Sequence, residues 1–516
     1  MKMMKKIMIA APKSGSGKTG ITIALLKALK EKGIRTVSFK SGPDYIDPLF
    51  HKSVLGIPSY NLDTYFTDDR TTKELFEKNS SGYDFAVIEG VMGLFDGVGG
   101  ISLEGSSYKL ASVTDTPIIL VVDAKGMGAI SIAALIKGFL CFDENKLIKG
   151  VILNRVSKAF FDRIKEKIEE ETGIKILGSV PERKDINISS RHLGLVTPND
   201  VENIESIKDI LYEEFEKNIS LNDIFELAES DNKKDTGNIY SDNGSENTIH
   251  ASAINDNTES GIQIHGSDIN SERLGEGIPD SGINQKKSVN DPANCVIAIA
   301  GDDAFCFLYE ENIDLLKENG ADIVFFSPLK DSSVPENADA IILPGGYPEE
   351  HLKELSENKS MMCSIKEAYA KGMPIVAECG GFMYLHKSIE DKEKNEYETV
   401  GMIDAKCFYT GRSQRFGYIE VKEKESNFMP EGETIKGHEF HYYESTDNGK
   451  SCVANKPNSA VSYDCIHVED NLWAGFAHLY YPSNISFAKS IVNKAYKYHN
   501  DPGKKHYSNL STKTLQ

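Results

Sequence analysis

The feature that most constrains this chain is a glycine-rich segment near its start, Pro12-Lys13-Ser14-Gly15-Ser16-Gly17-Lys18-Thr19. It follows a short apolar run, residues 6–11, and precedes a helical pattern that begins at Ile21. A glycine turn between a strand and a helix points backbone N–H groups at phosphate oxygens. In such loops the lysine reaches the β- and γ-phosphates and the last hydroxyl holds Mg²⁺. We therefore expect a nucleotide as a ligand, bound by Gly15, Gly17, Lys18 and Thr19.

The segment departs from the commonest phosphate-loop pattern at its first position, where Pro12 stands in place of glycine. Lys13 instead gives the variant K-x-G-x-G-K-T of deviant Walker loops. A flexible Gly/Ser loop is the plain alternative. The strand before it, the helix after it and the intact Gly-Lys-Thr favour the phosphate loop.

Length and composition limit the class of protein. A chain of 516 residues exceeds what one hydrophobic core usually serves, so we expect two or three domains. A net charge of -20 argues against nucleic acid or an anionic membrane as a partner. The apolar run after the basic start is too short for a signal peptide, and no stretch reaches the ~20 apolar residues of a membrane helix, so we expect a cytoplasmic protein. The eight cysteines contain no C-x-x-C pair, which argues against a disulfide scaffold or a cysteine zinc site.

The N-terminal half alternates short β-branched runs with helical patterns. Helical spacing is found over 21–31 and 159–171, and the predicted strands are 6–11, 36–40, 85–90, 117–124, 150–156 and 174–181. This order predicts an α/β fold with a doubly wound parallel sheet, whose ligands gather at the carboxyl ends of the strands.

From about residue 230 to 293 the composition changes to Ser, Asn, Asp and Gly with few core-forming residues. Such a segment cannot bury enough apolar surface to fold, so we expect a disordered linker, with a functional lid as the alternative. The polar end, 499–516, reads as a tail. The expected domains are therefore 1–229 and 294–498.

The C-terminal half begins a second α/β pattern. Helices are expected over 310–319 and 361–371, and strands over 295–301, 322–328, 338–344 and 374–378. The last strand runs into Glu378-Cys379-Gly380-Gly381. A sharp strand-to-helix turn presents a reactive side chain, and a helix N-terminus beneath it lowers the pKa of a thiol. Cys379 is therefore a nucleophile candidate that we expect to be exposed, and a buried structural cysteine is the alternative.

Several motifs together resemble a known family. Segments 343–349 (LPGGYPE), 377–381 (AECGG) and 477–480 (AHLY) resemble the class I glutamine amidotransferase domain of cobyrinate and cobyrate type. Those of the N-terminal half resemble the phosphate-loop domain of the cobyrinic acid a,c-diamide synthase family; they are 40–48 (KSGPDYIDP), 89–97 (EGVMGLFDG) and 191–195 (RHLGL). A further segment, 437–442 (GHEFHY), extends the resemblance, which covers nearly the whole chain outside the linker and tail.

For the N-terminal half the resemblance implies an ATP-dependent amidoligase. Thr19, Asp44 and Glu89 would complete a Mg²⁺ site, with a plain turn residue as the alternative for Asp44. Asp47 and Asp96 would lie on the corrinoid side. Asn154 would contact the adenine, and a plain loop asparagine is the alternative.

For the C-terminal half the resemblance implies a glutaminase. Cys379 would attack the glutamine amide, His478 would carry the proton, and N–H groups near Gly346 and Gly380 would form the oxyanion hole. Tyr480 stands where many such triads have a carboxylate, which predicts a dyad. Because free ammonia is easily lost to water, we expect the two halves to be in contact, with residues 412–418 and 438–442 near that contact.

The resemblance implies cobyrinate, L-glutamine and ATP as substrates, in cobalamin synthesis. A nickel sirohydrochlorin is the alternative macrocycle for the same mechanism. A nucleotide-switch protein is the alternative class, because Lys13 in partitioning ATPases reaches across a dimer, and for this reason we also allow for a homodimer. The glutaminase motifs argue against a switch.

Overall fold

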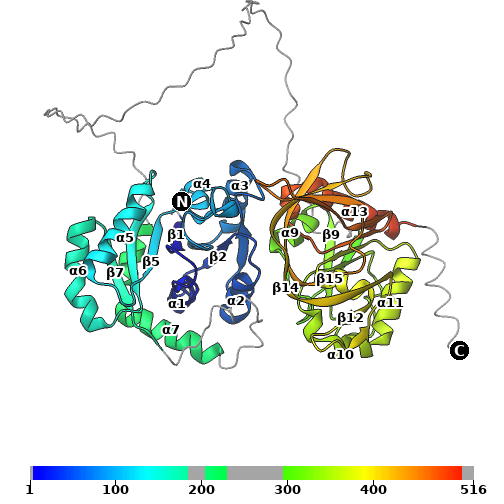
Figure 1. Ribbon diagram of the computed structural model, residues 1–516, viewed down its shortest axis with the longest axis horizontal. Helices are drawn as coiled ribbons and strands as arrows, with labels where there is room; N and C mark the ends of the chain where they lie inside the picture. The colour runs from blue at the N-terminus through cyan, green and yellow to red at the C-terminus, as the bar shows by residue number, and fades with distance from the viewer. Residues whose placement is uncertain (1–3, 184–203, 229–294, 502–516) are drawn as a thin grey trace, which may run out of the picture. The chain divides into compact units, whose positions relative to one another are not determined.

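The computed structural model describes residues 4–183, 204–228 and 295–501 (Figure 1). The segment 191–195, the expected linker and most of the expected tail lie outside the described residues. The described residues on either side of the linker cluster as one compact unit. The division into domains at 229 and 294 stays a prediction.

The N-terminal half contains a seven-stranded sheet in the order β3-β2-β4-β1-β5-β6-β7, in which every neighbouring pair is parallel. The predicted parallel sheet is therefore confirmed. Its strands are β1 (Lys5–Ala10), β2 (Thr36–Ser41), β3 (Ser59–Leu62), β4 (Phe85–Glu89), β5 (Ile118–Asp123), β6 (Ile148–Asn154) and β7 (Lys175–Val180).

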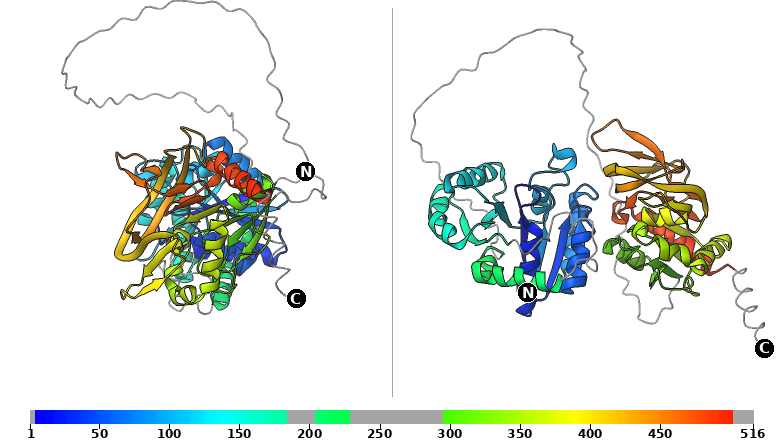
Figure 2. Two further views of the ribbon diagram at one scale, coloured as in Figure 1. Left: turned by 90° about the vertical axis from the view of Figure 1, so that its right-hand side faces the viewer. Right: turned by 60° about the horizontal axis from the view of Figure 1, so that its bottom comes forward.

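Helices cover both faces of this sheet (Figures 1 and 2). Ile7 and Ile9 of β1 pack with one set of helices and Met8 and Ala10 with the other, because side chains alternate along a strand. The first set is α1 (Lys18–Glu31), α2 (Ile46–Leu55), α7 (Ile204–Asn218) and α8 (Leu221–Ala228). The second set is α3 (Asp69–Ser80), α4 (Ser107–Val113), α5 (Ala129–Phe142) and α6 (Lys158–Thr172). A 3₁₀ turn, η1, spans Val98–Gly100.

The C-terminal half contains a six-stranded sheet in the order β18-β19-β11-β10-β8-β9, parallel except at β18. Its strands are β8 (Cys295–Ala300), β9 (Ala321–Phe326), β10 (Ala340–Leu343), β11 (Ile375–Glu378), β18 (His467–Glu469) and β19 (Leu472–Gly475). The helices of this half are α9 (Glu310–Glu318), α10 (Leu352–Glu357), α11 (Lys359–Ala370), α12 (Gly380–Leu385) and α13 (Ile485–His499), with 3₁₀ turns η3 (Pro348–Glu350) and η4 (Tyr481–Ser483).

A third, mostly antiparallel sheet carries residues of the site and was not predicted. Its main path is β13-β12-β14-β15-β20, and β16 and β17 continue from β14. The strands are β12 (His386–Glu390), β13 (Glu396–Glu398), β14 (Ile403–Glu423), β15 (Thr434–Ser445), β16 (Cys452–Asn455), β17 (Ser462–Cys465) and β20 (His478–Leu479).

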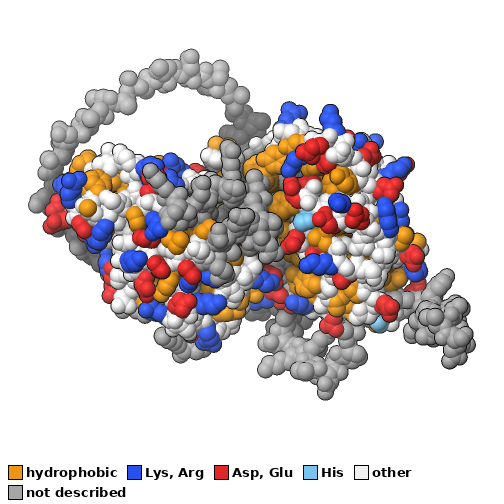
Figure 3. Space-filling model, turned by 90° about the horizontal axis from the view of Figure 1, so that it is seen from below, with side chains coloured by type: hydrophobic (Ala, Val, Ile, Leu, Met, Phe, Trp, Pro, Cys, Tyr) orange, Lys and Arg blue, Asp and Glu red, His pale blue; other side chains and the backbone are white. Residues whose placement is uncertain are grey.

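The surface and the cysteines bear on the expected class of protein. On the face drawn in Figure 3, acidic and basic side chains are interspersed. Five of the eight cysteines are buried, and none of them forms a disulfide within the described ranges.

Candidate active sites

The phosphate loop connects β1 to α1, with Gly15 at φ 73° and Gly17 at φ 96°. A Cβ on Gly17 would lie 2.1 Å from Asn154 Nδ2, so only glycine fits there. Asn154, at the end of β6, donates from Nδ2 to the Ser16 carbonyl at 2.8 Å. Asn154 therefore holds the phosphate loop in place through this hydrogen bond, and its contact with adenine stays a prediction.

Arg155 is a second support of the loop that sequence reasoning missed. Its guanidinium donates to the Gly15 carbonyl at 2.6 Å and pairs with Asp123 at 3.1 Å. The residue has φ 60°, an uncommon backbone conformation for a side chain of this size. Its position directly after a buried strand end was the signal that could have found it.

Thr19 and Glu89 meet at the carboxyl end of the sheet. The Thr19 hydroxyl donates to Glu89 Oε1 at 2.6 Å, because β1 and β4 are neighbours and Glu89 closes β4. Glu89 is fully buried, and His51 Nε2 lies 3.4 Å from its other oxygen. Burial alone would raise the pKa of Glu89, but Lys40 and His51 hold it well below its usual range.

A buried lysine, Lys40, links the three acidic residues of this cluster. Its Nζ contacts Asp47 and lies 3.3 Å from Glu89 and 3.7 Å from Asp44. Burial opposes its charge, yet the carboxylates outweigh burial and raise the pKa of Lys40. In the sequence analysis Lys40 was only the first residue of the segment 40–48, with no role expected of it. A lysine at the end of a predicted strand was the available signal.

Asp44 and Asp47 occupy different environments. Asp44 Oδ1 accepts from the Ile46 N–H at 2.9 Å, so it acts as a turn residue while its second oxygen faces Lys40. Asp47 is buried, and burial together with Glu89 raises its pKa despite the contact with Lys40. Asp47 thus lies within the Lys40 cluster, and its role toward a corrinoid stays a prediction.

The segment after β4 closes over the phosphate loop. Lys18 Nζ donates to the Met92 carbonyl at 2.6 Å, and the Leu94 N–H donates to the Ala11 carbonyl at 2.8 Å. Asp96 Oδ2 accepts from the Gly93 N–H at 3.1 Å and so holds this segment in place. Burial, with Lys40 nearby, lowers the pKa of Lys18 to about 8.

The side chains around Thr19 offer oxygen atoms of the types that Mg²⁺ binds. Hydroxyl and carboxylate oxygens are the ligands that Mg²⁺ prefers, and it usually takes only one or two carboxylates besides phosphates and water. Thr19 and Glu89 already touch, and Asp44 joins them through Lys40. Within the described ranges, no group of three or more His, Cys, Asp or Glu forms a metal site. A cation here would therefore depend on the nucleotide phosphates.

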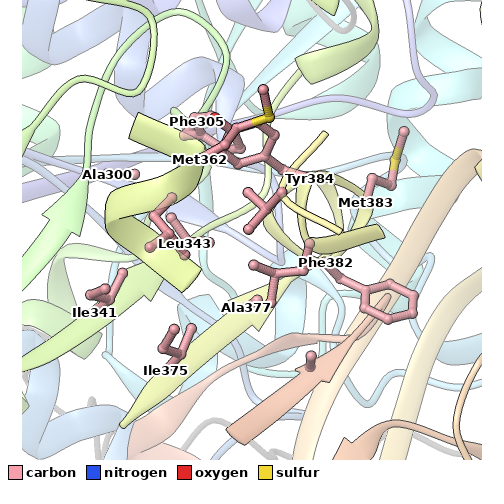
Figure 4. Packing of buried hydrophobic residues seen from close by; sticks show 14 of the residues in the cluster. Ala300, Phe305, Ile341, Leu343, Met362, Ile375, Ala377, Phe382, Met383 and Tyr384 are labelled. Atoms are coloured by element: carbon pink, nitrogen blue, oxygen red, sulfur yellow. The ribbon is translucent and has the colours of Figure 1, made fainter. Parts of the chain in front are cut away.

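Cys379 lies on a strained turn between β11 and α12, with φ 45° and ψ -103°. The turn is fixed by close packing, since a Cβ on Gly381 would lie 2.0 Å from the Leu343 carbonyl oxygen. Ala377 and Phe382, on either side of the turn, belong to the buried cluster drawn in Figure 4. The predicted sharp strand-to-helix turn is confirmed.

Two expectations about the thiol were wrong. Cys379 is 6% exposed, although the glycines after it suggested exposure, because Phe382 and its neighbours close around it. Burial, together with Glu349, raises the pKa of the Cys379 thiol well above its usual value, whereas a helix N-terminus was expected to lower it. The α12 helix has only six residues, too short a dipole to outweigh burial.

His478 lies close to Cys379, as expected. A Cβ on Gly345 would lie 2.3 Å from His478 Cε1 and 3.4 Å from Cys379 Cβ, so one small residue separates the two side chains. A Cβ on Gly380 would lie 3.0 Å from the Gly346 nitrogen. The two expected oxyanion-hole residues are therefore neighbours, and their role stays a prediction.

Among the residues that the structure describes, no carboxylate is hydrogen-bonded to His478. His478 is 2% exposed, and its Nδ1 has no hydrogen-bond partner in the described structure. In the register of β15 and β20 it lies opposite His438, and the two rings stack with centroids 4.9 Å apart and planes at 17°. Burial, with His438 and His441 nearby, lowers the pKa of His478 well below its usual value. The imidazole is therefore neutral at neutral pH.

Residues of the two halves are in contact, and the predicted segments 412–418 and 438–442 each contribute. The Tyr418 hydroxyl donates to Asp63 at 2.7 Å, and the ring of His438 packs against Tyr45. Sequence reasoning missed Asp63 and the buried Glu311, which accepts from the Asn61 N–H at 2.5 Å.

Comparison with known proteins identifies both halves. Residues 7–196 match the CobQ/CobB/MinD/ParA nucleotide binding domain, and residues 296–484 match the CobB/CobQ-like glutamine amidotransferase domain. None of the described helices is long and apolar enough to cross a membrane.

Similar proteins match over almost their whole length. The chain is 36% identical to a cobyrinate a,c-diamide synthase of Caldanaerobacter subterraneus, covering 92% of this chain and 95% of that protein. It is 36% identical to one of Listeria innocua, covering 93% and 97%, and 35% identical to one of Clostridium tetani, covering 95% and 100%. The chain therefore belongs to the cobyrinate a,c-diamide synthase family.

Proposed function

We propose that this protein converts the a and c carboxylates of cobyrinate into amides, with ATP as the activating substrate and glutamine as the nitrogen source. The observation that carries the proposal is the presence of two groups of candidate catalytic residues in one chain. One is the phosphate loop with Thr19 on Glu89, and the other is Cys379 beside His478.

Activation is needed because a carboxylate does not react with ammonia. A carboxylate oxygen attacks the γ-phosphorus of ATP, the bond to the bridging oxygen breaks, and ADP leaves with that oxygen. The acyl phosphate that remains has a good leaving group. Lys18 and the backbone N–H groups at Gly15 and Gly17 stabilise the charge that develops on the phosphates.

Mg²⁺ would be held by Thr19, Asp44 and Glu89, and it supplies charge neutralisation and orientation of the phosphates. Lys40 favours the ionised form of Glu89 and holds Asp47 in place. Asp96 fixes the segment that covers Lys18, and Asp47, beside Lys40, would orient the acceptor carboxylate.

Ammonia comes from the glutamine side chain. The Cys379 sulfur attacks the amide carbon while its proton passes to neutral His478, which gives it to the departing nitrogen. The N–H groups of Gly346 and Gly380 receive the developing oxyanion. Water then hydrolyses the thioester to glutamate. Ammonia displaces phosphate from the acyl phosphate and forms the amide.

The test is direct incubation of the purified protein with ATP, glutamine and one macrocycle at a time, followed by mass spectrometry of the macrocycle. Cobyrinate should gain two amides with release of ADP, phosphate and glutamate. Amidation of nickel sirohydrochlorin but not of cobyrinate would refute the proposed substrate. ATP hydrolysis without any amide would refute the proposed reaction.

A further inference from the structure

We propose that Tyr45 is a positioning residue for His478. Its ring comes from the loop before α2, which carries Asp44 and leads directly to Asp47 in the first turn of that helix, and through it glutamine hydrolysis depends on the conformation of that loop. The inference rests on the proposed function, because it assigns His478 to glutamine hydrolysis and the loop to carboxylate activation.

Tyr45 is buried against the histidines of the C-terminal half. Its ring centroid lies 5.4 Å from that of His478 and 5.6 Å from that of His438. It stacks on Phe307 with centroids 5.2 Å apart and planes at 6°, and lies 4.4 Å from the ring of Tyr309. A residue of the N-terminal half therefore forms one wall of the histidine's surroundings.

Packing has to orient His478, because polar contacts do not. Its Nδ1 has no hydrogen-bond partner among the described residues. Tyr480, two residues on, is turned away toward Phe66, and its hydroxyl donates to the Asn61 carbonyl. Among the described residues, the rings that contact this neutral imidazole and can hold its direction are those of His438, Tyr45 and Phe307.

The other end of Tyr45 belongs to the activation site. It directly precedes α2, whose first turn is fixed by Asp44 Oδ1 on the Ile46 N–H. Asp44 and Asp47, on either side of Tyr45 in sequence, both face Lys40. When Asp44 coordinates a cation that is bound with the nucleotide, the adjoining backbone, which carries the Tyr45 ring, must shift.

A second contact connects the same loop to the stacked histidines. The Tyr309 hydroxyl donates to the Pro43 carbonyl at 3.4 Å and lies 3.3 Å from His438 Nδ1. Pro43 and Tyr45 thus reach His438 and His478 by two adjacent routes. If the loop that carries Pro43 and Tyr45 has two conformations, the His478 imidazole has two corresponding orientations. Coupling between two sites requires such an element with two states.

The test compares Tyr45→Ala, Tyr45→Phe and the control Tyr65→Ala. Tyr65 contacts Phe66 and Tyr418 at the same contact between the halves, and no ring contact joins it to His478. Glutamate release is measured with and without ATP and cobyrinate, and amidation is measured separately with ammonium salt.

In Tyr45→Ala, kcat for glutamate release should fall by about 100-fold, the effect of an ångström-scale misplacement of a catalytic group, with little change in KM. Its response to ATP and cobyrinate should be lost, while amidation with ammonium should persist. Tyr45→Phe retains the ring and should behave like the wild type, as should Tyr65→Ala.

Wild-type glutamate release in Tyr45→Ala, still responsive to ATP and cobyrinate, would overturn the inference. So would equal losses of glutamate release and ammonium-dependent amidation, because that pattern indicates general structural damage. Failure of the proposed function has a different signature, namely a wild-type protein that forms no amide from cobyrinate with either nitrogen source.

Discussion

His438 and His478 stack face to face across two antiparallel strands, with ring centroids 4.9 Å apart. Burial lowers the pKa of both rings, that of His438 to about 3, so the stack is uncharged at neutral pH. Two neutral imidazoles can lie this close without repulsion. His478, the candidate base for glutamine hydrolysis, is therefore neutral across the physiological range of pH.

The first prediction concerns the pH dependence of the thiol. Because burial raises the pKa of Cys379 above its ordinary 9.0, the group is protonated at pH 7 and its alkylation by iodoacetamide should be slow. The rate should keep rising above pH 9, and Cys379→Ala corrects for the other cysteines. Rapid alkylation with a midpoint below pH 8 would mean that the thiolate is stabilised in solution.

The second prediction separates the two half-reactions. Cys379→Ala should abolish glutamine-dependent amidation and retain amidation with a high concentration of ammonium salt, because the thiol serves only ammonia release. Product amides are measured by mass spectrometry with each nitrogen source. Loss of both activities in a folded variant would contradict this division.

The third prediction concerns the phosphate loop. Lys18→Ala removes a cation whose interaction strengthens as charge develops on the phosphates, so turnover should fall by about 100-fold or more with either nitrogen source. Glutamate release without ATP should be unchanged and serves as the control. Near-normal amidation in this variant would place the nucleotide elsewhere.

The fourth prediction concerns two cycles at one site. One phosphate loop and one Cys379 must serve two carboxylates, so each diamide should consume two ATP, and the monoamide should be able to leave between cycles. Asp47→Asn should slow one amidation more than the other and let monoamide accumulate in a time course. A mutant that makes diamide with no extra monoamide would remove Asp47 from that role.

The fifth prediction concerns stability and Glu311, which is 3% exposed and whose Oε2 has no hydrogen-bond partner in the described structure. Burial raises its pKa from 4.5 to about 8. A raised carboxyl pKa contributes stability below the unfolded value, near pH 4.5, and this is lost as pH rises through about 8.

Glu311→Gln should therefore unfold at a higher temperature than the wild type at pH 9 and at a similar temperature at pH 4.5. The neighbouring Glu310, which pairs with Lys52, provides the control variant Glu310→Gln. Equal shifts of the unfolding temperature in both variants at both pH values would show that the ionisation of Glu311 does not destabilise the protein.

Sequence reasoning located the strands that end at the sites but not the third sheet. Short, continuous apolar strands such as β1 and β11 are recognised from composition because both of their faces are buried. The 21-residue strand β14 is different. Its pairing with β15 shifts register twice and its middle residues are partly or fully exposed, so buried side chains alternate only near its two ends.

The candidate residues were found through motifs, and their environments were not. That Thr19 would meet Glu89 follows from the strand ends of a parallel sheet. The burial of Lys40 among three carboxylates depends on how α2 and the turn before it pack against the sheet, and the local sequence does not indicate that packing. The burial of Cys379 likewise comes from Phe382 and its packing partners, which no local pattern around the cysteine indicates.

The backbone at Cys379, with φ 45° and ψ -103°, stores strain at the candidate nucleophile. Holding a side chain in such a conformation costs on the order of 1–3 kcal/mol, and glycine would relieve much of it. A Cys379→Gly variant would therefore relax the turn and at the same time remove the thiol that the proposed glutamine hydrolysis requires.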